Sequence, residues 1–277
     1  MENSYPFYQI DAFASAPFQG NQACIMPLEA GFLSDATLQA IAAENNVAET
    51  AYLVANGDGV WQLRWFTPAV EVPLCGHATL AAAHVLFAEL GYSGAAITFR
   101  TRQSGELIVR RCESGYVMDF PAPEVFAIEA SEEIVAALGA RPVAAWGGPF
   151  FAAQFDSAET VKGLKPDLRA LSKLGVSGHG GSWDRGNFGC FALGGENVDL
   201  TSRFFAPGSG IDEDPATGSW HCMLTRIGAS LLGRTAMSCY QAFPGRGAQI
   251  GCELRGDRVD LKGEAVTVIR GDFLLPA

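Results

Sequence analysis

Alternation of apolar and polar residues predicts β-strands along much of the chain. The clearest runs lie at residues 8–13, 23–26, 51–54, 61–66, 97–101, 105–109, 116–120, 250–254, 259–261 and 265–269. The runs 51–54 and 61–66 are joined by Asn56-Gly57-Asp58-Gly59, which is typical of a hairpin turn. Neighbouring runs separated by such short turns pair in antiparallel fashion. The pattern therefore predicts sheets that are mostly antiparallel.

Helical patterns are fewer. They predict helices at residues 35–44, 77–90, 132–138 and 218–232. Ser34 and Ser131 can cap the two shorter helices, and Gly139 can end the second of these. The segments 77–90 and 218–232 are apolar nearly all round, which indicates helices enclosed by other elements rather than lying on a surface.

Similar turns precede the two apolar helices. The first helix follows Pro73-Leu74-Cys75-Gly76-His77-Ala78-Thr79, and the second follows Asp212 to Ser219. Placing Cys75 against Pro215 gives an offset of 140 residues (215 − 75), about half of the chain of 277 residues. A chance similarity between two short Gly/Thr turns is the alternative to a duplicated domain.

A duplication predicts an α+β fold of two pseudo-symmetric domains, each a curled, mostly antiparallel sheet around a central helix. The N-terminal domain would take residues 1–120 plus about 266–277. The C-terminal domain would take residues 124–265, after a linker near Pro121-Ala122-Pro123.

The composition fits a chain with a large core and narrows its partners. Charged residues make up 18% and hydrophobic residues 48%, whereas disordered chains carry more charge and fewer apolar groups. The net charge of −11 argues against nucleic-acid binding, which needs a basic surface. No signal peptide or apolar run of about 20 residues is visible. We therefore expect a cytoplasmic protein with no nucleic-acid or membrane partner.

The seven cysteines are scattered and include no C-x-x-C pair. Free thiols fit a reducing compartment, and a zinc ribbon or a redox dithiol is not indicated. Gly178-His179-Gly180-Gly181 is rich in glycine but lacks the G-x-G-x-x-G fingerprint, so we predict a flexible loop there. Since no metal-ligand spacing or phosphate loop is present either, we expect no metal and no cofactor.

The stretch 45–50 is the first of three that carry candidate chemistry. Glu49 lies just before the apolar run at residues 51–54. A carboxylate that is partly shielded from water holds its proton more tightly and can carry protons near neutral pH. The alternative is a solvated loop carboxylate.

The second stretch is Cys75-Gly76-His77, at a predicted helix start. Gly76 lets the backbone approach a ligand closely, and free N–H groups at a helix start attract anions. His77 could bind a substrate or serve a structural role. Cys75, if exposed at the helix N-terminus, would have a lowered pKa and could act as a thiolate base.

The third stretch runs from Asp214 to Ser219. Asp214 could accept a hydrogen bond from a substrate amine or hydroxyl, and Gly218 and Ser219 offer N–H groups and a hydroxyl. The alternative is an N-cap turn in which a side chain of this stretch caps the helix. Because the two helix starts belong to related halves, we expect them to face each other across an interdomain cleft that binds a small carboxylate.

These motifs together resemble the PhzF-like phenazine-biosynthesis family. The matching stretches are Asp11-Ala12-Phe13, Phe18-Gln19-Gly20-Asn21, residues 45–50, Phe66-Thr67-Pro68, Glu71-Val72-Pro73, Gly76-His77-Ala78-Thr79 and residues 213–219. They occur in order, and the resemblance covers the chain from about residue 8 to 270. It implies a diaminopimelate-epimerase-like fold and an isomerase that needs no cofactor or metal. We expect such a protein to be a homodimer.

The resemblance also implies roles for single residues. The characterised phenazine enzyme acts on trans-2,3-dihydro-3-hydroxyanthranilate, and its glutamate removes a proton from a ring carbon and returns it further along the conjugated system. The residue that matches this glutamate is Glu49. His77 and Asp214 would orient the amine and hydroxyl of the substrate. Its carboxylate would be bound by Gly76, Gly218 and Ser219.

Two other functions stay open at this point. A cysteine-dependent racemase or epimerase of the same fold needs one thiol from each half. Cys75 could supply the first, but the position opposite is Pro215, which cannot carry a proton, and Cys222 lies too deep in the helix. A non-catalytic metabolite-binding protein is the other alternative, although binding alone would not need Glu49, His77 and Asp214 together.

Overall fold

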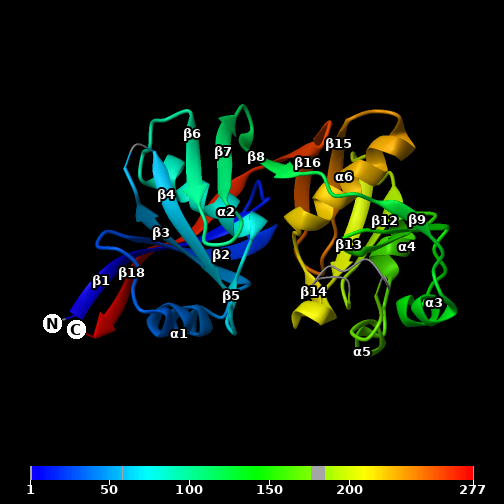
Figure 1. Ribbon diagram of the computed structural model, residues 1–277, viewed down its shortest axis with the longest axis horizontal. Coiled ribbons are helices and arrows are strands. Elements are labelled where there is room, and N and C mark those ends of the chain that lie inside the picture. The colour runs from blue at the N-terminus through cyan, green and yellow to red at the C-terminus, as the bar shows by residue number, and fades with distance from the viewer. Residues whose placement is uncertain (1, 58, 176–184, 277) are drawn as a thin grey trace. The chain divides into compact units, whose positions relative to one another are not determined.

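The computed structural model describes residues 2–57, 59–175 and 185–276 (Figure 1), so the predicted loop at 178–181 lies outside the described residues. The chain forms two compact units. Unit 1 comprises Met1–Asp119 and Lys262–Ala277, and unit 2 comprises Phe120–Leu261. Among the described residues, no helix has the length and apolar character needed to cross a membrane.

Residues 262–265, assigned from the sequence to the C-terminal domain, belong to unit 1. The Ala14 amide donates to the Glu264 carbonyl at 3.2 Å. A Cβ atom placed on Gly263 would lie 2.3 Å from Cδ1 of Phe13, so only glycine allows this close packing. These contacts tie the segment to unit 1.

Unit 1 contains one long sheet and a buried helix. Its elements are β1 (Glu2–Ala12), β2 (Asn21–Leu28), α1 (Asp35–Asn45), β3 (Glu49–Ala55), β4 (Val60–Phe66), β5 (Glu71–Val72), α2 (Gly76–His84), the π-helical turn η1 (Val85–Glu89), β6 (Ala96–Arg100), β7 (Glu106–Cys112), β8 (Gly115–Pro121) and β18 (Ala265–Pro276). The order β18-β1-β2-β3-β4-β6-β7-β8 is antiparallel except for the pairs β2–β3 and β4–β6. Helix α2 packs against β1, β2, β3 and β18, and its residues 77–83 are all buried.

Unit 2 repeats this plan. Its elements are β9 (Phe126–Ile128), α3 (Glu132–Leu138), β10 (Ala144–Gly147), β11 (Phe151–Gln154), α4 (Ala158–Gly163), α5 (Leu168–Leu171), β12 (Phe188–Leu193), β13 (Leu200–Phe205), the short 3-10 helix η2 (Pro207–Ser209), β14 (Glu213–Asp214), α6 (Gly218–Leu232), β15 (Ala236–Gln241), β16 (Ala248–Arg255) and β17 (Arg258–Gly263). Helix α6 packs against β15 and β16.

The two units share one order of strand pairing. In unit 1, β2 runs parallel to β3, β3 is antiparallel to β4, and β4 is parallel to β6. In unit 2, β11, β12, β13 and β15 are paired in the same succession. The central helix connects the last parallel pair in each case. The predicted α+β fold with two pseudo-symmetric domains is therefore confirmed.

The register of the sheets corrects the predicted offset. Phe66 pairs with Glu71 in unit 1, and Phe205 pairs with Glu213 in unit 2. Counting on from these glutamates, the residue equivalent to Cys75 is Thr217. Both are the N-cap residues of their helices, so the offset here is 142 residues (217 − 75). The sequence alignment of Cys75 with Pro215 was wrong by two positions because the loop before Glu213 is longer than the loop before Glu71.

Three of the four predicted helices are confirmed, and so are the predicted caps of the two shorter ones. The Ser34 hydroxyl accepts from the Thr37 amide at 3.1 Å, and the Ser131 hydroxyl accepts from the Ile134 amide at 3.3 Å. Gly139 ends α3 in the left-handed conformation with φ 76°, which glycine adopts without steric cost. These local signals could be recognised in the sequence because they depend on neighbours only three residues apart.

The fourth helix was predicted as one α-helix over 77–90, and this is wrong in its last part. The α-helix stops at His84, and residues 85–89 form a π-helical turn in which the Leu90 amide donates to the Val85 carbonyl at 2.9 Å. The Arg111 guanidinium lies 4.4 Å from the Phe87 ring centre and donates to the Phe87 carbonyl. Tertiary contacts therefore determine the conformation of residues 85–89. The helical periodicity of the sequence does not indicate these contacts.

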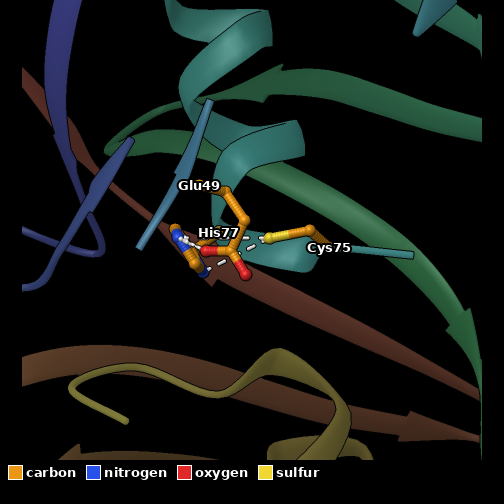
Figure 2. A group of neighbouring side chains, drawn as sticks. All are labelled: Glu49, Cys75 and His77. Atoms are coloured by element: carbon orange, nitrogen blue, oxygen red, sulfur yellow. Dashed lines mark hydrogen bonds and ion pairs between the residues drawn. The ribbon is translucent and has the colours of Figure 1, made fainter. Parts of the chain in front are cut away.

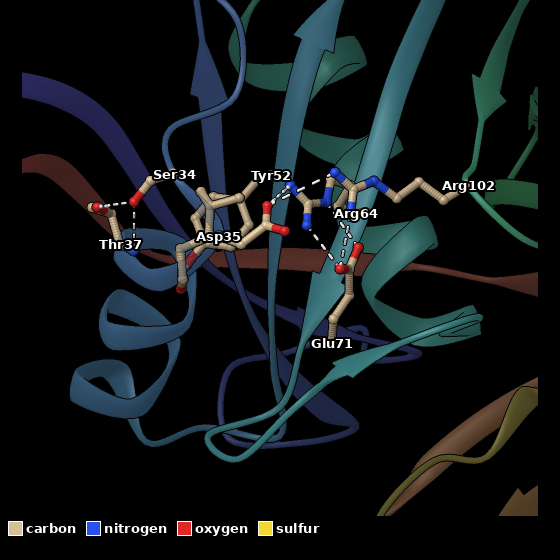
Figure 3. Close-up of polar contacts among 8 residues, drawn as sticks. Ser34, Asp35, Thr37, Tyr52, Arg64, Glu71 and Arg102 are labelled. Atoms are coloured by element: carbon tan, nitrogen blue, oxygen red, sulfur yellow. Dashed lines mark hydrogen bonds and ion pairs between the residues drawn. The ribbon is translucent and has the colours of Figure 1, made fainter.

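In each unit a buried arginine links the sheet to the turn that precedes the central helix. Arg64 of β4 donates to both carboxylate oxygens of Glu71 at 2.8 and 2.7 Å, and it also pairs with Asp35 at 2.9 Å (Figure 3). Arg203 of β13 holds Glu213 at 2.7 Å through two nitrogens. Each pair fixes a two-residue strand, β5 or β14, that leads into a turn with candidate site residues.

Acid should weaken unit 1 through the Arg64–Glu71 pair. Hydrogen bonding from Arg64 holds the pKa of Glu71 below its usual value, and burial opposes this only in part. A carboxyl group with a lowered pKa in the folded state stabilises above its unfolded pKa, near 4.3, and this contribution is lost as the pH falls through the lower folded value. We expect the free energy of unfolding to fall below about pH 4, and Glu71→Gln to lose part of that slope. Urea unfolding at several pH values measures how the free energy of unfolding depends on pH. The same dependence in wild type and Glu71→Gln would contradict this prediction.

Candidate active site

The side chains of Glu49, Cys75 and His77 converge in unit 1 (Figure 2). Oε2 of Glu49 lies 2.9 Å from Nε2 of His77. Sγ of Cys75 lies 3.5 Å from Nδ1 and 4.0 Å from Nε2 of the same ring. The side chains of His77 and Glu49 are 6% and 17% exposed, so the carboxylate is the member of the cluster that solvent reaches most readily.

The turn between α1 and β3 places Glu49. Asn46 ends α1 in the left-handed conformation with φ 48°, and its amide donates to the Ala42 carbonyl. The Asn45 side chain donates to the Thr50 hydroxyl at 3.0 Å, which ties the two ends of the turn together. Glu49 is the first residue of β3 and pairs in register with Ala23 of β2. Its backbone is therefore part of the sheet, and the carboxylate is held on a rigid element.

The surroundings of His77 act on its pKa in opposite directions. Burial by itself lowers the pKa of His77. The Cys75 sulfur and the Glu49 carboxylate raise it by more than burial lowers it, so the pKa lies well above its usual value. Cys75 is a neutral thiol at neutral pH, so Glu49 is the anion that acts on the imidazole there. With Nε2 2.9 Å from Oε2, the imidazole is placed to orient the Glu49 carboxylate.

Cys75 does not behave as a helix-terminal thiolate. Its side chain is buried, and burial together with the nearby Glu49 charge raises the pKa of the thiol to about 11. The sequence expectation of a lowered pKa depended on exposure and is corrected here. The residue of unit 2 that is equivalent to Cys75 is Thr217. Its hydroxyl cannot replace the second thiol that a cysteine-dependent racemase or epimerase needs.

Asn21 supports His77 from a strained loop. Its side-chain amide lies 3.2 Å from Nδ1 of His77. The loop before it contains Phe13 and Phe18 at φ 57° and 71°, values that cost a bulky residue about 1–3 kcal/mol. The buried carboxylate of Asp11 accepts the Phe18 amide at 2.7 Å and helps hold this conformation. Strain of this kind persists where the fold needs one particular loop shape.

In unit 2 a buried glutamine organises the Asp214–Ser219 turn. Gln241 donates to the Asp214 carbonyl at 2.6 Å and to the Thr217 hydroxyl at 3.1 Å, and it accepts the Thr217 amide at 2.9 Å. The Thr217 hydroxyl in turn donates to Oδ2 of Asp214 at 2.6 Å. Thr217 is the N-cap residue, but its side chain does not cap α6. The hydroxyl therefore orients the Asp214 carboxylate instead.

The structure assigns the predicted site residues to two groups. Glu49, Gly76 and His77 lie together in unit 1, and Asp214, Gly218 and Ser219 share one turn of unit 2. The sequence did not single out Asn21, Thr217 or Gln241. Asn21 and Thr217 stood inside recognised motifs, whereas Gln241 ends strand β15 outside the three stretches that carried candidate chemistry.

A cavity of about 700 Å³ in unit 2 does not include this turn. Its walls are formed by Lys162, Glu196, Asn197, Val198, Thr201, Arg203, Tyr240, Ala242, Phe243, Pro244 and Gln249. The one buried cation there, Arg203, is already paired with Glu213. Size alone therefore does not make this cavity the reaction site, and the converging acid and histidine in unit 1 remain the better candidate.

The fold defines a class: two-domain α+β proteins with an epimerase-like fold, and in this chain a polar cluster lies at the start of the central helix of unit 1. A solved hydroxyproline epimerase from Agrobacterium vitis shares the fold, with a TM-score of 0.57 and 10% identity over 98% of this chain and 93% of that one. A PhzF-family crystal structure from Enterococcus faecalis is far more similar, with a TM-score of 0.90 and 38% identity over 99% of this chain and 100% of that one.

The chain belongs to the PhzC–PhzF family of phenazine biosynthesis-like proteins, whose family model matches residues 10–271. The predicted resemblance is thereby confirmed. An uncharacterized isomerase of Pseudomonas aeruginosa is 42% identical over 270 residues, which cover 97% of this chain and 98% of the relative.

Proposed function

We propose that this protein is a cofactor-independent isomerase that moves a proton on a small cyclic or conjugated carboxylic acid related to dihydro-hydroxyanthranilate. The observation that supports it best is the Glu49 carboxylate, partly buried and held 2.9 Å from Nε2 of His77. Membership of the family and the relative named an isomerase support the reaction class. The substrate class comes from the family resemblance.

In this proposal Glu49 is both base and acid. Its carboxylate takes a proton from a substrate carbon, and the electron pair of the broken C–H bond spreads into the conjugated system. Glu49 then returns the proton to a different carbon, so no co-reactant is needed and the charge balances. His77, whose Nε2 lies 2.9 Å from Oε2, would orient the carboxylate for both transfers.

The remaining contacts are proposed for the turn of unit 2 and the two helix starts. Asp214, oriented by Thr217, would accept a hydrogen bond from a substrate amine or hydroxyl. Ser219 and the N–H groups of Gly76 and Gly218 would bind the carboxylate, because helix N-termini favour anions. We also propose a homodimer, which sedimentation of the purified chain would test.

Exchange of hydrogen with solvent tests this function. The purified protein is incubated in D2O with trans-2,3-dihydro-3-hydroxyanthranilate and, separately, with a bacterial metabolite extract. We expect deuterium on carbon in a recovered compound, since a proton held on a carboxylate can exchange with water. Wild-type protein that places no deuterium in either sample would show the isomerase proposal to be wrong.

Replacing Cys75 separates the carboxylate mechanism from a thiol mechanism. With Glu49 as the acid/base, we expect Cys75→Ser to keep its turnover number within about tenfold of wild type, whereas loss of a true acid/base group costs about 10²–10⁴. Initial rates under saturating substrate measure this. A loss of the larger size, in a variant with an unchanged circular dichroism spectrum, would favour the cysteine-dependent racemase or epimerase.

A further inference from the structure

We infer that Glu49, Cys75 and His77 form a binding site for a soft divalent cation of the zinc class, and that such a cation inhibits the protein by occupying its acid/base group. The inhibition rests on the function proposed above, whereas the binding does not. The sequence indicated no metal site because the donors come from two segments without metal-ligand spacing.

The cluster offers one oxygen, one sulfur and one nitrogen donor. The three ligand atoms all lie within 4.8 Å of one another, and within the described ranges no other group of three His, Cys, Asp or Glu side chains meets this condition. Zinc binds nitrogen and oxygen at ~2.0–2.2 Å and sulfur at ~2.3 Å in tetrahedral geometry. Such donors lie about 3–4 Å apart, and the separations of Nε2 from Oε2 and from Sγ are 2.9 and 4.0 Å.

An unsatisfied acceptor points to the same place. Oε2 of Glu49 is buried and makes no hydrogen bond to any described residue, although Nε2 of His77 is 2.9 Å away. An oxygen beside the ring nitrogen but without a hydrogen bond to it is suitably placed to share a cation with that nitrogen. Three protein ligands also leave one position for water, as in zinc sites that are open to solvent.

Asn21 can hold the His77 ring in the orientation that a metal ligand needs. A histidine that binds metal through Nε2 carries its proton on Nδ1 and donates it to an acceptor. The Asn21 amide lies 3.2 Å from Nδ1, and rotation of the amide by half a turn presents its carbonyl oxygen there. The ring orientation needed for a ligand is therefore already fixed.

The donor set selects the cation. Thiolate and imidazole favour zinc and its heavier relatives, whereas magnesium and calcium prefer oxygen donors. Binding displaces the thiol proton of Cys75 and the ring proton on Nε2 into solvent. We therefore expect zinc and cadmium to bind, and magnesium not to compete.

Cadmium titration of the full chain tests the site without reference to turnover. We expect one Cd²⁺ per chain to produce a sulfur-to-cadmium charge-transfer band in the ultraviolet, and Cys75→Ser to remove it. Glu49→Gln and His77→Gln should each weaken binding at least about tenfold, the size seen even when a partner of a ligand is removed. Cys112→Ser is the matched control, because Cys112 is the described cysteine that is not buried; its band should equal that of wild type.

Several results would overturn the proposal. A band that does not depend on Glu49 and His77 would reveal a lone thiol, and a band that persists in Cys75→Ser would reveal another cysteine. No band at all would exclude the site. If isomerase activity is found, zinc should inhibit it reversibly with a chelator and should do so more weakly in Cys75→Ser, relative to the metal-free rate of that variant. If no activity is found, the proposed function fails, and the titration still decides the metal site.

Discussion

Replacing Glu49 by glutamine is expected to lower the turnover number by about 10²–10⁴, the usual contribution of a positioned acid/base group. The amide has the shape of the carboxylate but can neither accept nor return a proton. Since β3 and the turn before it hold the backbone of residue 49, the loss should appear in the rate and not in the fold. Initial rates and deuterium incorporation from D2O measure it together.

Two further variants sharpen this test. Glu44→Gln removes an exposed carboxylate from α1, five residues earlier in the chain, and should keep the full rate. Glu49→Asp keeps the charge but withdraws it by one methylene, so its rate should lie between those of wild type and Glu49→Gln. A Glu49→Gln protein with wild-type turnover would show that another group carries the proton. Deuterium exchange by the wild type, together with a Glu49→Gln protein that still binds ligand but exchanges none, would exclude a purely binding role for the site.

The local features of the fold could be predicted, and the long-range ones could not. Ser34, Ser131 and Gly139 were recognised because a cap depends on residues three positions away. Strands β12 and β13 gave no signal because nearly all their residues are buried. A strand covered on both faces loses the alternation by which strands are recognised.

The candidate site divides in the same way. From residue types alone, Glu49 was one carboxylate beside a strand, and only the family resemblance placed it with His77. Their contact spans 28 residues (77 − 49), and no local pattern reports such a pairing. The burial that makes Cys75 a thiol is likewise a property of the packed unit. The repeat was visible, but hydrogen bonding between strands was needed to show that Thr217, and not Pro215, is equivalent to Cys75.

Replacing Glu213 by glutamine is expected to cost about 3–5 kcal/mol of stability, because it leaves the buried charge of Arg203 without its anion. The side chains of Arg203 and Glu213 are only 9% and 11% exposed. Chemical unfolding of the full chain, followed by circular dichroism, measures the loss. The matched control is Glu132→Gln in the same unit, whose partner Arg141 is held at a similar distance but whose side chains are 79% and 62% exposed. That variant should lose less than about 1 kcal/mol, and an equal loss in both would contradict the prediction.

Apolar double variants then separate the two arginine pairs, because their remaining hydrogen bonds differ. Replacing a buried ion pair by apolar residues is often close to neutral, so Arg64→Met with Glu71→Leu should recover most of the stability lost in Glu71→Gln. Arg203 also donates to the Leu164, Lys162 and Val161 carbonyls at the end of α4, at 2.7, 3.2 and 3.5 Å. Arg203→Met with Glu213→Leu removes these bonds and leaves the Leu164 carbonyl, which accepts the shortest of them, without that donor, at about 1–3 kcal/mol. We therefore expect no such recovery in unit 2, and equal recovery in the two units would show that these carbonyl bonds contribute little.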